Sequence, residues 1–175
     1  MTNKDALAHL DKGKELLSDG KCDEAILELD RALSIDGKSA DAYLYRGHAY
    51  VSKGDRDRVT ADDLPPIEQS QVYDGRGDYD HAIADYSSAL ALNPATPEIL
   101  CARGHAYRRK GAYDRAIEDY TVALGVKPDC RDALNNRGVV HYRMGSHKLA
   151  IRDWEAILKI DPNDATARQS IEIAR

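Results

Sequence analysis

The stretch that decides the fold is Ile99–Asp129, ILCARGHAYRRKGAYDRAIEDYTVALGVKPD. The pattern returns in Ala133–Asn163, ALNNRGVVHYRMGSHKLAIRDWEAILKIDPN, 34 residues further along the chain. Both copies place an Arg-Gly pair before a second glycine, followed by an Ala-Ile pair, a carboxylate, an aromatic residue and a closing proline. Apolar residues recur every three or four positions on either side of the second glycine, which predicts two amphipathic helices joined by a short turn.

Two less regular copies of this pattern precede it towards the N-terminus. With the four copies in register, the units are 6–39, 40–96, 97–130 and 131–164. The second unit is longer than the others, and its extra residues form an insertion at 55–76. After the fourth unit, residues 165–174 have a helical composition and predict a short cap helix. We therefore expect one all-α domain over residues 1–175.

The repeat resembles the tetratricopeptide repeat in its length and in the placement of its small residues. Its Arg-Gly pairs resemble the bacterial style of that family. The resemblance implies a right-handed α-solenoid of four helix-turn-helix units closed by a short cap helix. It also implies a protein that does no chemistry and instead acts as an adaptor or scaffold, holding a peptide or protein segment in a concave groove lined by the first helices.

Small residues mark where the helices end and where they meet. Three glycines are predicted to end first helices in a left-handed conformation: Gly20, Gly111 and Gly145. Three other glycines in first helices are predicted to face an alanine of the second helix: Gly47 with Ala82, Gly104 with Ala116, and Gly138 with Ala150. One position of the second helix is predicted to fill the core in every unit: Leu29, Tyr86, Tyr120 and Trp154.

A basic residue before the first-helix glycine recurs together with an acidic residue in the second helix. The pattern predicts an ion pair in each unit, which fixes how the helices meet. The four pairs are Lys12 with Glu28, Arg46 with Asp85, Arg103 with Asp119, and Arg137 with Asp153.

Groove-lining residues are assigned by register from the resemblance. The candidates are Leu10, Lys14 and Leu17 in the first unit; Leu44, Tyr45, His48 and Val51 in the second; Cys101, His105, Arg108 and Arg109 in the third; and Asn135, Val139, Tyr142 and Arg143 in the fourth. This set is apolar at its N-terminal end and basic and aromatic at its C-terminal end. A peptide with an apolar anchor and acidic groups would complement it. The alternative is that these are ordinary solvated helix positions.

One binding mode of the family is not expected here. Tetratricopeptide domains that hold chaperone tails grip a C-terminal carboxylate with two lysines, two asparagines and an arginine. The corresponding positions of this chain are Leu10, Lys14, Tyr45, Glu98 and Ala102. Since most of these side chains cannot bind a carboxylate, the sequence predicts that heat-shock chaperone tails do not bind.

The insertion at 55–76 is the feature that least resembles the repeat. Two copies of the turn pattern flank it, Lys53-Gly54-Asp55 and Arg76-Gly77-Asp78, and a short helix is predicted from Ile67 to Tyr73. Long excursions inside compact domains are commonly functional. We expect either a role in binding or self-assembly, or a solvated loop. Self-assembly into a homo-oligomer through the insertion or the terminal units is the alternative function.

Composition excludes several other classes of protein. A net charge of −5 offers no general attraction to nucleic acid or to anionic lipid, so neither is an expected partner. The N-terminus lacks the apolar stretch of a signal peptide, and three cysteines without a CxxC pair suit a reducing compartment, so we expect a cytoplasmic protein.

Catalytic and metal-binding patterns are weak. Cys101 and His105 lie four residues apart, with His48 at the matching position one unit earlier. A fourth ligand is lacking, so no metal and no cofactor is expected. The chain has no glycine-rich phosphate loop or nucleophile elbow, and we expect no enzymatic activity.

Overall fold

The computed structural model describes residues 2–62 and 76–175 of the 175-residue chain, which consist of helices and short connections. Within these ranges there is no strand, and the fold is an all-α solenoid of helical repeats, as predicted. The chain divides into two compact units, Met1–Pro94 and Ala95–Arg175. We call them the N-terminal unit and the C-terminal unit and describe each by itself.

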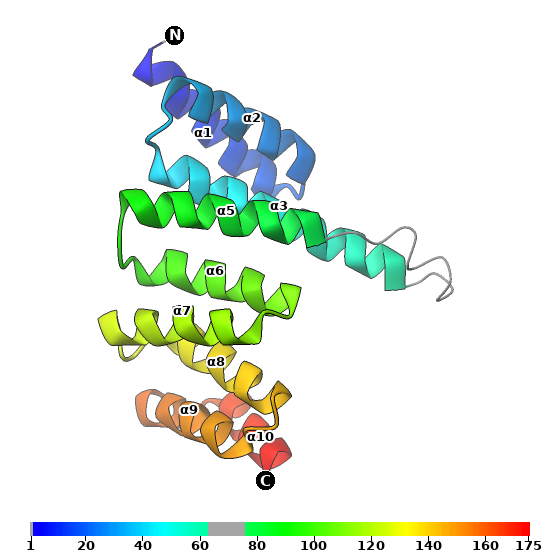
Figure 1. Ribbon diagram of the computed structural model, residues 1–175, viewed down its shortest axis with the longest axis vertical. Helices are drawn as coiled ribbons and strands as arrows, with labels where there is room; N and C mark the ends of the chain where they lie inside the picture. Colours follow the sequence, from blue (N-terminus) through cyan, green and yellow to red (C-terminus); the bar gives the residue numbers. More distant parts are fainter. Residues whose placement is uncertain (1, 63–75) are drawn as a thin grey trace. The chain divides into compact units, whose positions relative to one another are not determined.

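The described helices of the N-terminal unit are α1 (Asn3–Ser18), α2 (Cys22–Ile35), α3 (Ala40–Asp62) and α5 (Arg76–Leu92). Helices α1 and α2 form one antiparallel pair, and α3 and α5 form the next (Figure 1). Helix α2 also packs against α3, so the two pairs share one core. Two clusters of buried apolar residues fill it, one around Leu29 and Ala42 and the other around Leu16 and Ala49.

The C-terminal unit contains α6 (Pro97–Lys110), α7 (Tyr113–Val126), α8 (Arg131–Arg143), α9 (His147–Ile160) and α10 (Ala165–Ala174). The pairs α6–α7 and α8–α9 repeat the predicted helix-turn-helix, and α10 packs against α9 (Figure 1). A core cluster of this unit joins Leu134, Trp154 and Ile157 to Ile171 of α10. Helix α10 is therefore integrated into the fold, because its apolar face completes the core of the last pair.

The turns between paired helices confirm the predicted glycine signals. Gly20, Gly111 and Gly145 have φ of 75°, 85° and 75°. A left-handed conformation is sterically unfavourable for residues with a Cβ atom. No neighbour would contact a Cβ at Gly111, so conformational strain alone determines the cost of a substitution there.

Gly111→Ala is therefore expected to lower the free energy of unfolding by about 1–2 kcal/mol, the cost of left-handed backbone for an L-residue. Urea denaturation measures the change. Gly111→Asn is the matched control, and it should lose less than Gly111→Ala because asparagine tolerates this conformation. Equal losses for the two variants would contradict the strain explanation.

The second pair departs from the predicted turns. Helix α3 continues through Gly54, whose missing side chain leaves room for the ring of Tyr79, 3.3 Å from the position that a Cβ would occupy. The Tyr79 hydroxyl donates a hydrogen bond to Asp55 Oδ1 at 2.6 Å, which holds the extended end of α3 against α5. Helix α5 already begins at Arg76, so both Lys53-Gly54-Asp55 and Arg76-Gly77-Asp78 are helical, and the prediction of turns there was wrong. The predicted helix at 67–73 lies outside the described residues.

The first-helix glycines lie against the large core residue of the second helix. A Cβ at Gly104 would lie 2.8 Å from the ring of Tyr120, and a Cβ at Gly47 would lie 2.5 Å from the ring of Tyr86. Gly138 lies against Trp154 in the same way. The nearest neighbour of each of these glycines is thus the large core residue, because its ring extends across the space between the two helices.

Three of the four predicted ion pairs are confirmed. Arg103 and Asp119 form a bidentate pair with N–O distances of 2.8 and 2.9 Å, and Asp119 is buried. The same geometry joins Arg46 to Asp85 and Arg137 to Asp153. The arginines also reach the second helix of the preceding pair: Arg46 contacts Asp30 and Arg137 contacts Thr121.

The pair predicted for the first unit was wrong. Lys12 pairs with Glu15 on its own helix, at 2.8 Å. The Glu28 carboxylate instead binds His9 and Arg31, each at 2.6 Å. Lys12 is exposed and has a nearer carboxylate, Glu15, on its own helix. The link from α1 to Glu28 of α2 is therefore made by His9.

Candidate functional site

One face of α8 carries the side chains that line two pockets in the C-terminal unit. Residues spaced three or four apart on a helix share a face. On α8 this face comprises Arg131, Asp132, Asn135, Val139, Tyr142 and Arg143. Helix α10 provides the opposite wall and α9 contributes the floor. We call the two pockets together the α8–α10 groove.

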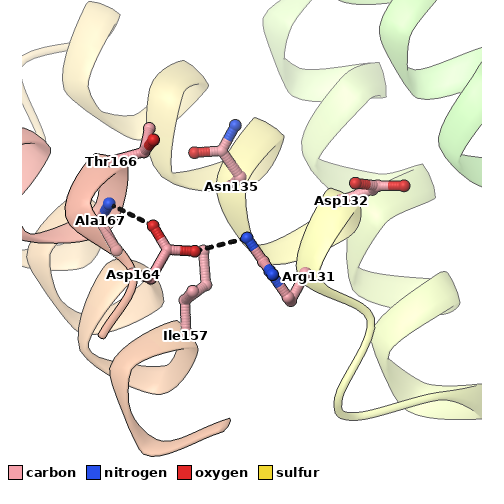
Figure 2. Close-up of a pocket in the computed structure, with 7 residues that line it drawn as sticks. All are labelled: Arg131, Asp132, Asn135, Ile157, Asp164, Thr166 and Ala167. Atoms are coloured by element: carbon pink, nitrogen blue, oxygen red, sulfur yellow. Dashed lines mark hydrogen bonds and ion pairs between the residues drawn. The ribbon is translucent and has the colours of Figure 1, made fainter. Parts of the chain in front are cut away.

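The pocket at the start of α8 is polar and has a volume of about 130 Å³ (Figure 2). Arg131 donates to the buried carboxylate of Asp164 at 2.5 Å, and the other oxygen of Asp164 accepts from the backbone N–H of Ala167 at 2.8 Å. Asp164 thereby caps the N-terminus of α10 and ties it to α8. The Arg131–Asp164 pair therefore helps to hold this pocket in shape, and Asp132 is a further carboxylate in its lining.

The pocket at the end of α8 is apolar and has a volume of about 220 Å³. Val139 and Tyr142 line it from α8, Trp154 from α9, and Ser170 and Ile173 from α10. Ile173 is 62% exposed, which is unusual for a large apolar side chain beside a pocket of this kind. The sixth lining residue, Arg143, is exposed and forms no ion pair within the described part of the chain.

Aromatic contacts hold the apolar pocket in shape. The Tyr142 ring lies 4.9 Å from the ring of His147 and 6.3 Å from that of Trp154, measured between centroids. His147 Nδ1 donates to the carbonyl of Ala174 at 3.3 Å, which links the start of α9 to the end of α10. The buried Trp154 Nε1 has no hydrogen-bond partner among the described residues. The walls are therefore positioned by packing before any ligand arrives.

The size of the pockets indicates what they can hold. Small-molecule sites typically have volumes of about 300–1,000 Å³. Each pocket of the α8–α10 groove is smaller and suits one side chain of a larger ligand. An apolar side chain fits the walls of the larger pocket, and an acidic group next to it would meet Arg143.

The predicted residues of the third unit lie on α6, in the same compact unit. His105 and Arg109 are half-buried. Arg108 is also half-buried, and its Nε atom is buried without a hydrogen-bond partner among the described residues. Cys101 Sγ lies 3.9 Å from Cys130 Sγ. Burial, followed by the neighbouring Cys130, raises the pKa of the Cys101 thiol to about 12.

Three of the seven predicted residues in the N-terminal unit form a cluster. Lys14 Nζ lies 4.7 Å from the centre of the Tyr45 ring, and that ring contacts His48 edge-on at 6.0 Å. His48 also shares a hydrogen bond of 3.1 Å with the Tyr86 hydroxyl, and burial lowers the pKa of its imidazole. Of the other four, Leu17 and Leu44 are half-buried, whereas Leu10 and Val51 are buried at 5% and 8% exposure.

Sequence reasoning did not place α10 or Trp154 in the site. The sequence assigned Trp154 to the core, where it does lie, but its ring also forms part of the pocket. It treated 165–174 only as a cap helix, although Ser170 and Ile173 form a wall. An isoleucine at 173, two positions after the core residue Ile171, falls outside the buried stripe of a helix and was the available signal.

Two further properties concern chemistry and location. Across residues 2–62 and 76–175, no three histidine, cysteine or acidic side chains lie close enough together to hold a metal ion. None of the described helices combines the length and the apolar character needed to cross a membrane.

Several solved structures share this fold. The crystal structure of MamA protein is 22% identical, with a TM-score of 0.78, covering 99% of this chain and 82% of that one. Pseudomonas aeruginosa pilF gives 19% identity and a TM-score of 0.74, covering 98% of this chain and 68% of that one. The first TPR of Spaghetti (RPAP3), bound to the HSP90 peptide SRMEEVD, gives 23% identity and a TM-score of 0.53, covering 68% of this chain and 90% of that one. At these identities the likeness concerns the fold.

Two models of one family match the sequence itself. The model described as TPR repeat matches residues 13–54 and 72–111, and the model described as Tetratricopeptide repeat matches residues 101–165. The comparison with curated proteins gave no match. The two family models together span well over half of the chain and agree with the helix pairs and the repeat length. The chain therefore belongs to the tetratricopeptide repeat family.

Proposed function

We propose that this protein is a protein–protein interaction module that binds a polypeptide segment in the α8–α10 groove. The observation that supports the proposal is the apolar pocket of about 220 Å³ beside Arg143, which forms no ion pair with any described residue. An apolar side chain of the partner enters between Tyr142, Trp154 and Ile173. An acidic group of the partner, one or two residues along, pairs with Arg143.

The charge at the apolar end of the groove, that of Arg143, favours an acidic group of the partner there, while Asp132 places a carboxylate at the polar end. Arg131, at the other end of the groove, is already bound to Asp164, so it adds little attraction for a second carboxylate. Arg143 is exposed and has no ion-pair partner among residues 2–62 and 76–175, and its planar guanidinium suits bidentate recognition of a carboxylate. Walls already held by the Tyr142–His147 contact and by the His147 hydrogen bond reduce the cost of ordering on binding.

A random-peptide display selection against the full chain tests the proposal. We expect the selected peptides to share an apolar residue close to aspartate or glutamate. Trp154 is the only tryptophan of the chain and lines the pocket, so its fluorescence reports occupancy directly. A synthetic peptide of the selected sequence should shift the Trp154 emission in a saturable way, and its variant with lysine in place of the acid should bind more weakly.

Substitutions in the groove provide the second arm of the test. Tyr142→Ala and Arg143→Glu should each weaken the peptide by roughly tenfold or more, since aromatic and arginine residues dominate such sites. Val122→Ala is the matched control, because Val122 is half-exposed on α7 and lines neither pocket of the groove. Unchanged affinity in both groove variants would overturn the proposed site.

Sedimentation velocity separates an external peptide from a second copy of the chain. If the protein dimerises with increasing concentration, and Tyr142→Ala with Arg143→Glu abolishes the dimer, the occupant of the groove is the chain itself. A persistent monomer leaves an external polypeptide as the partner.

A further inference from the structure

Two of the three cysteines come together within the C-terminal unit. Cys101 lies in the second turn of α6, and Cys130, 29 positions further along the sequence, is the N-cap residue of α8. Their sulfur atoms are 3.9 Å apart and form a weak thiol–thiol hydrogen bond. Both are free thiols and both are half-buried, so a small reagent can reach them.

We propose that Cys101 and Cys130 form a reversible disulfide when the protein meets an oxidising low-molecular-weight disulfide such as oxidised glutathione. A disulfide bond is about 2.05 Å long, so the sulfurs must approach by roughly 2 Å. Side-chain rotation at both residues can supply much of this movement. Cys130 precedes the first helical turn of α8, with an extended backbone at φ −68° and ψ 96°.

The reaction balances with one molecule of oxidised glutathione. The thiolate of one cysteine attacks a glutathione sulfur, which breaks the glutathione disulfide and releases one glutathione thiolate. The second cysteine loses its proton and attacks the protein sulfur of the mixed disulfide. The S–S bond between the two cysteines forms, a second glutathione thiolate leaves, and the two released thiolates take up the two protons. The protein thiols are oxidised and the glutathione disulfide is reduced.

The surroundings of Cys101 keep its side chain in the thiol form, which slows its oxidation. Burial raises the pKa of the Cys101 thiol to about 12, and the nearby Cys130, Asp132 and Glu98 act in the same direction. At neutral pH the Cys101 thiol is therefore protonated, and no repulsion between two thiolates separates the sulfurs. The same effect makes exchange slow, so the experiment needs long equilibration in mildly alkaline buffer.

The bond would tie the start of α6 to the start of α8 and so enclose α7 in a covalent loop. Cys130 directly precedes Arg131, whose contact with Asp164 holds α10. Oxidation would therefore restrain the polar end of the α8–α10 groove. The disulfide does not depend on the proposed peptide-binding function and can be tested without it.

The decisive measurement compares the native and the unfolded protein. The full-length Cys22→Ser variant, which keeps only these two thiols, is equilibrated with reduced and oxidised glutathione, with and without urea. The ratio of disulfide to dithiol gives an effective concentration in each state. We expect the effective concentration in the native protein to exceed that in the unfolded protein by roughly tenfold or more. By linkage, the disulfide then stabilises the fold by about 1.4 kcal/mol per factor of ten. If the effective concentration in the native protein were equal to or lower than that in the unfolded protein, the proposal would be overturned.

Wild-type protein provides an independent readout should Cys22→Ser fold poorly. Cys22 is buried in the other compact unit, and its thiol donates to the carbonyl of Gly20 at 3.6 Å. Peptide mapping after native oxidation should show the Cys101–Cys130 link with Cys22 still reduced, and dithiothreitol should reverse it. Cys130→Ser should lose the internal link. Native links to Cys22, or glutathione adducts at both Cys101 and Cys130, would contradict the inference.

Discussion

Arg137→Ala is expected to lower the free energy of unfolding of the C-terminal unit by about 3–5 kcal/mol, the cost of leaving a buried charge without its partner. Asp153 is 5% exposed and binds Arg137 through two hydrogen bonds of 2.7 and 2.9 Å. Removing the arginine leaves this carboxylate unpaired in the core, and it also removes the contact to Thr121 on the preceding pair. Urea denaturation followed by the fluorescence of Trp154 measures the loss in the unit concerned.

Two further variants separate the ion pair from side-chain truncation. Arg152→Ala removes an exposed arginine on α9, next to Asp153 in the chain, and should change stability by less than about 0.5 kcal/mol. The double variant Arg137→Met with Asp153→Leu should be more stable than Arg137→Ala, because no buried charge remains. If the double variant were as unstable as Arg137→Ala, packing rather than charge would explain the effect.

Gly104→Ala is the second variant with a large expected effect. Alanine usually stabilises a helix relative to glycine, by about 0.5–1 kcal/mol. At position 104, however, the added methyl would lie 2.8 Å from the ring of Tyr120, which is fully buried and cannot move aside freely. We expect a net loss of about 1–3 kcal/mol, as for other overpacked cores.

Gly125→Ala is the matched control for Gly104→Ala. Gly125 lies in α7 of the same unit, is exposed, and no atom would come within 4 Å of a Cβ there. The control should gain up to about 0.5–1 kcal/mol, so the two alanine substitutions should have opposite signs. A gain in both would show that Tyr120 yields at little cost and that close approach of the helices is not what position 104 requires.

Half of the site could be read from the sequence and half could not. Asn135, Val139 and Tyr142 share one face of α8, which follows from helical spacing alone, and Arg143 lies beside them at the end of the helix. That α10 lies opposite this face is a packing outcome, determined by the burial of Ala167 and Ile171 against α9. No local pattern states which helix an apolar stripe will contact.

The same division explains the errors in the fold. The turn prediction at Gly54 rested on a tripeptide that resembles the other turns, but Tyr79 from α5 packs over that glycine and α3 continues. The prediction for Lys12 rested on its register, whereas Glu28 binds His9 and Arg31. The first error arose because Tyr79, distant in the sequence, packs over the glycine, and the second because Lys12 has a nearer carboxylate, Glu15, on its own helix.

The 34-residue stretch from Pro97 to Cys130, with its copy in the next unit, determined the helices, the turn glycines and the Arg–Asp pairs of this protein. These features depend on contacts within one repeat or between a repeat and its neighbour, so each copy carries the information needed to form them. Only the tertiary structure decided the α8–α10 groove and the approach of Cys101 to Cys130. Both arise where separate helices meet, and which side chains meet there depends on how the whole core fills its volume.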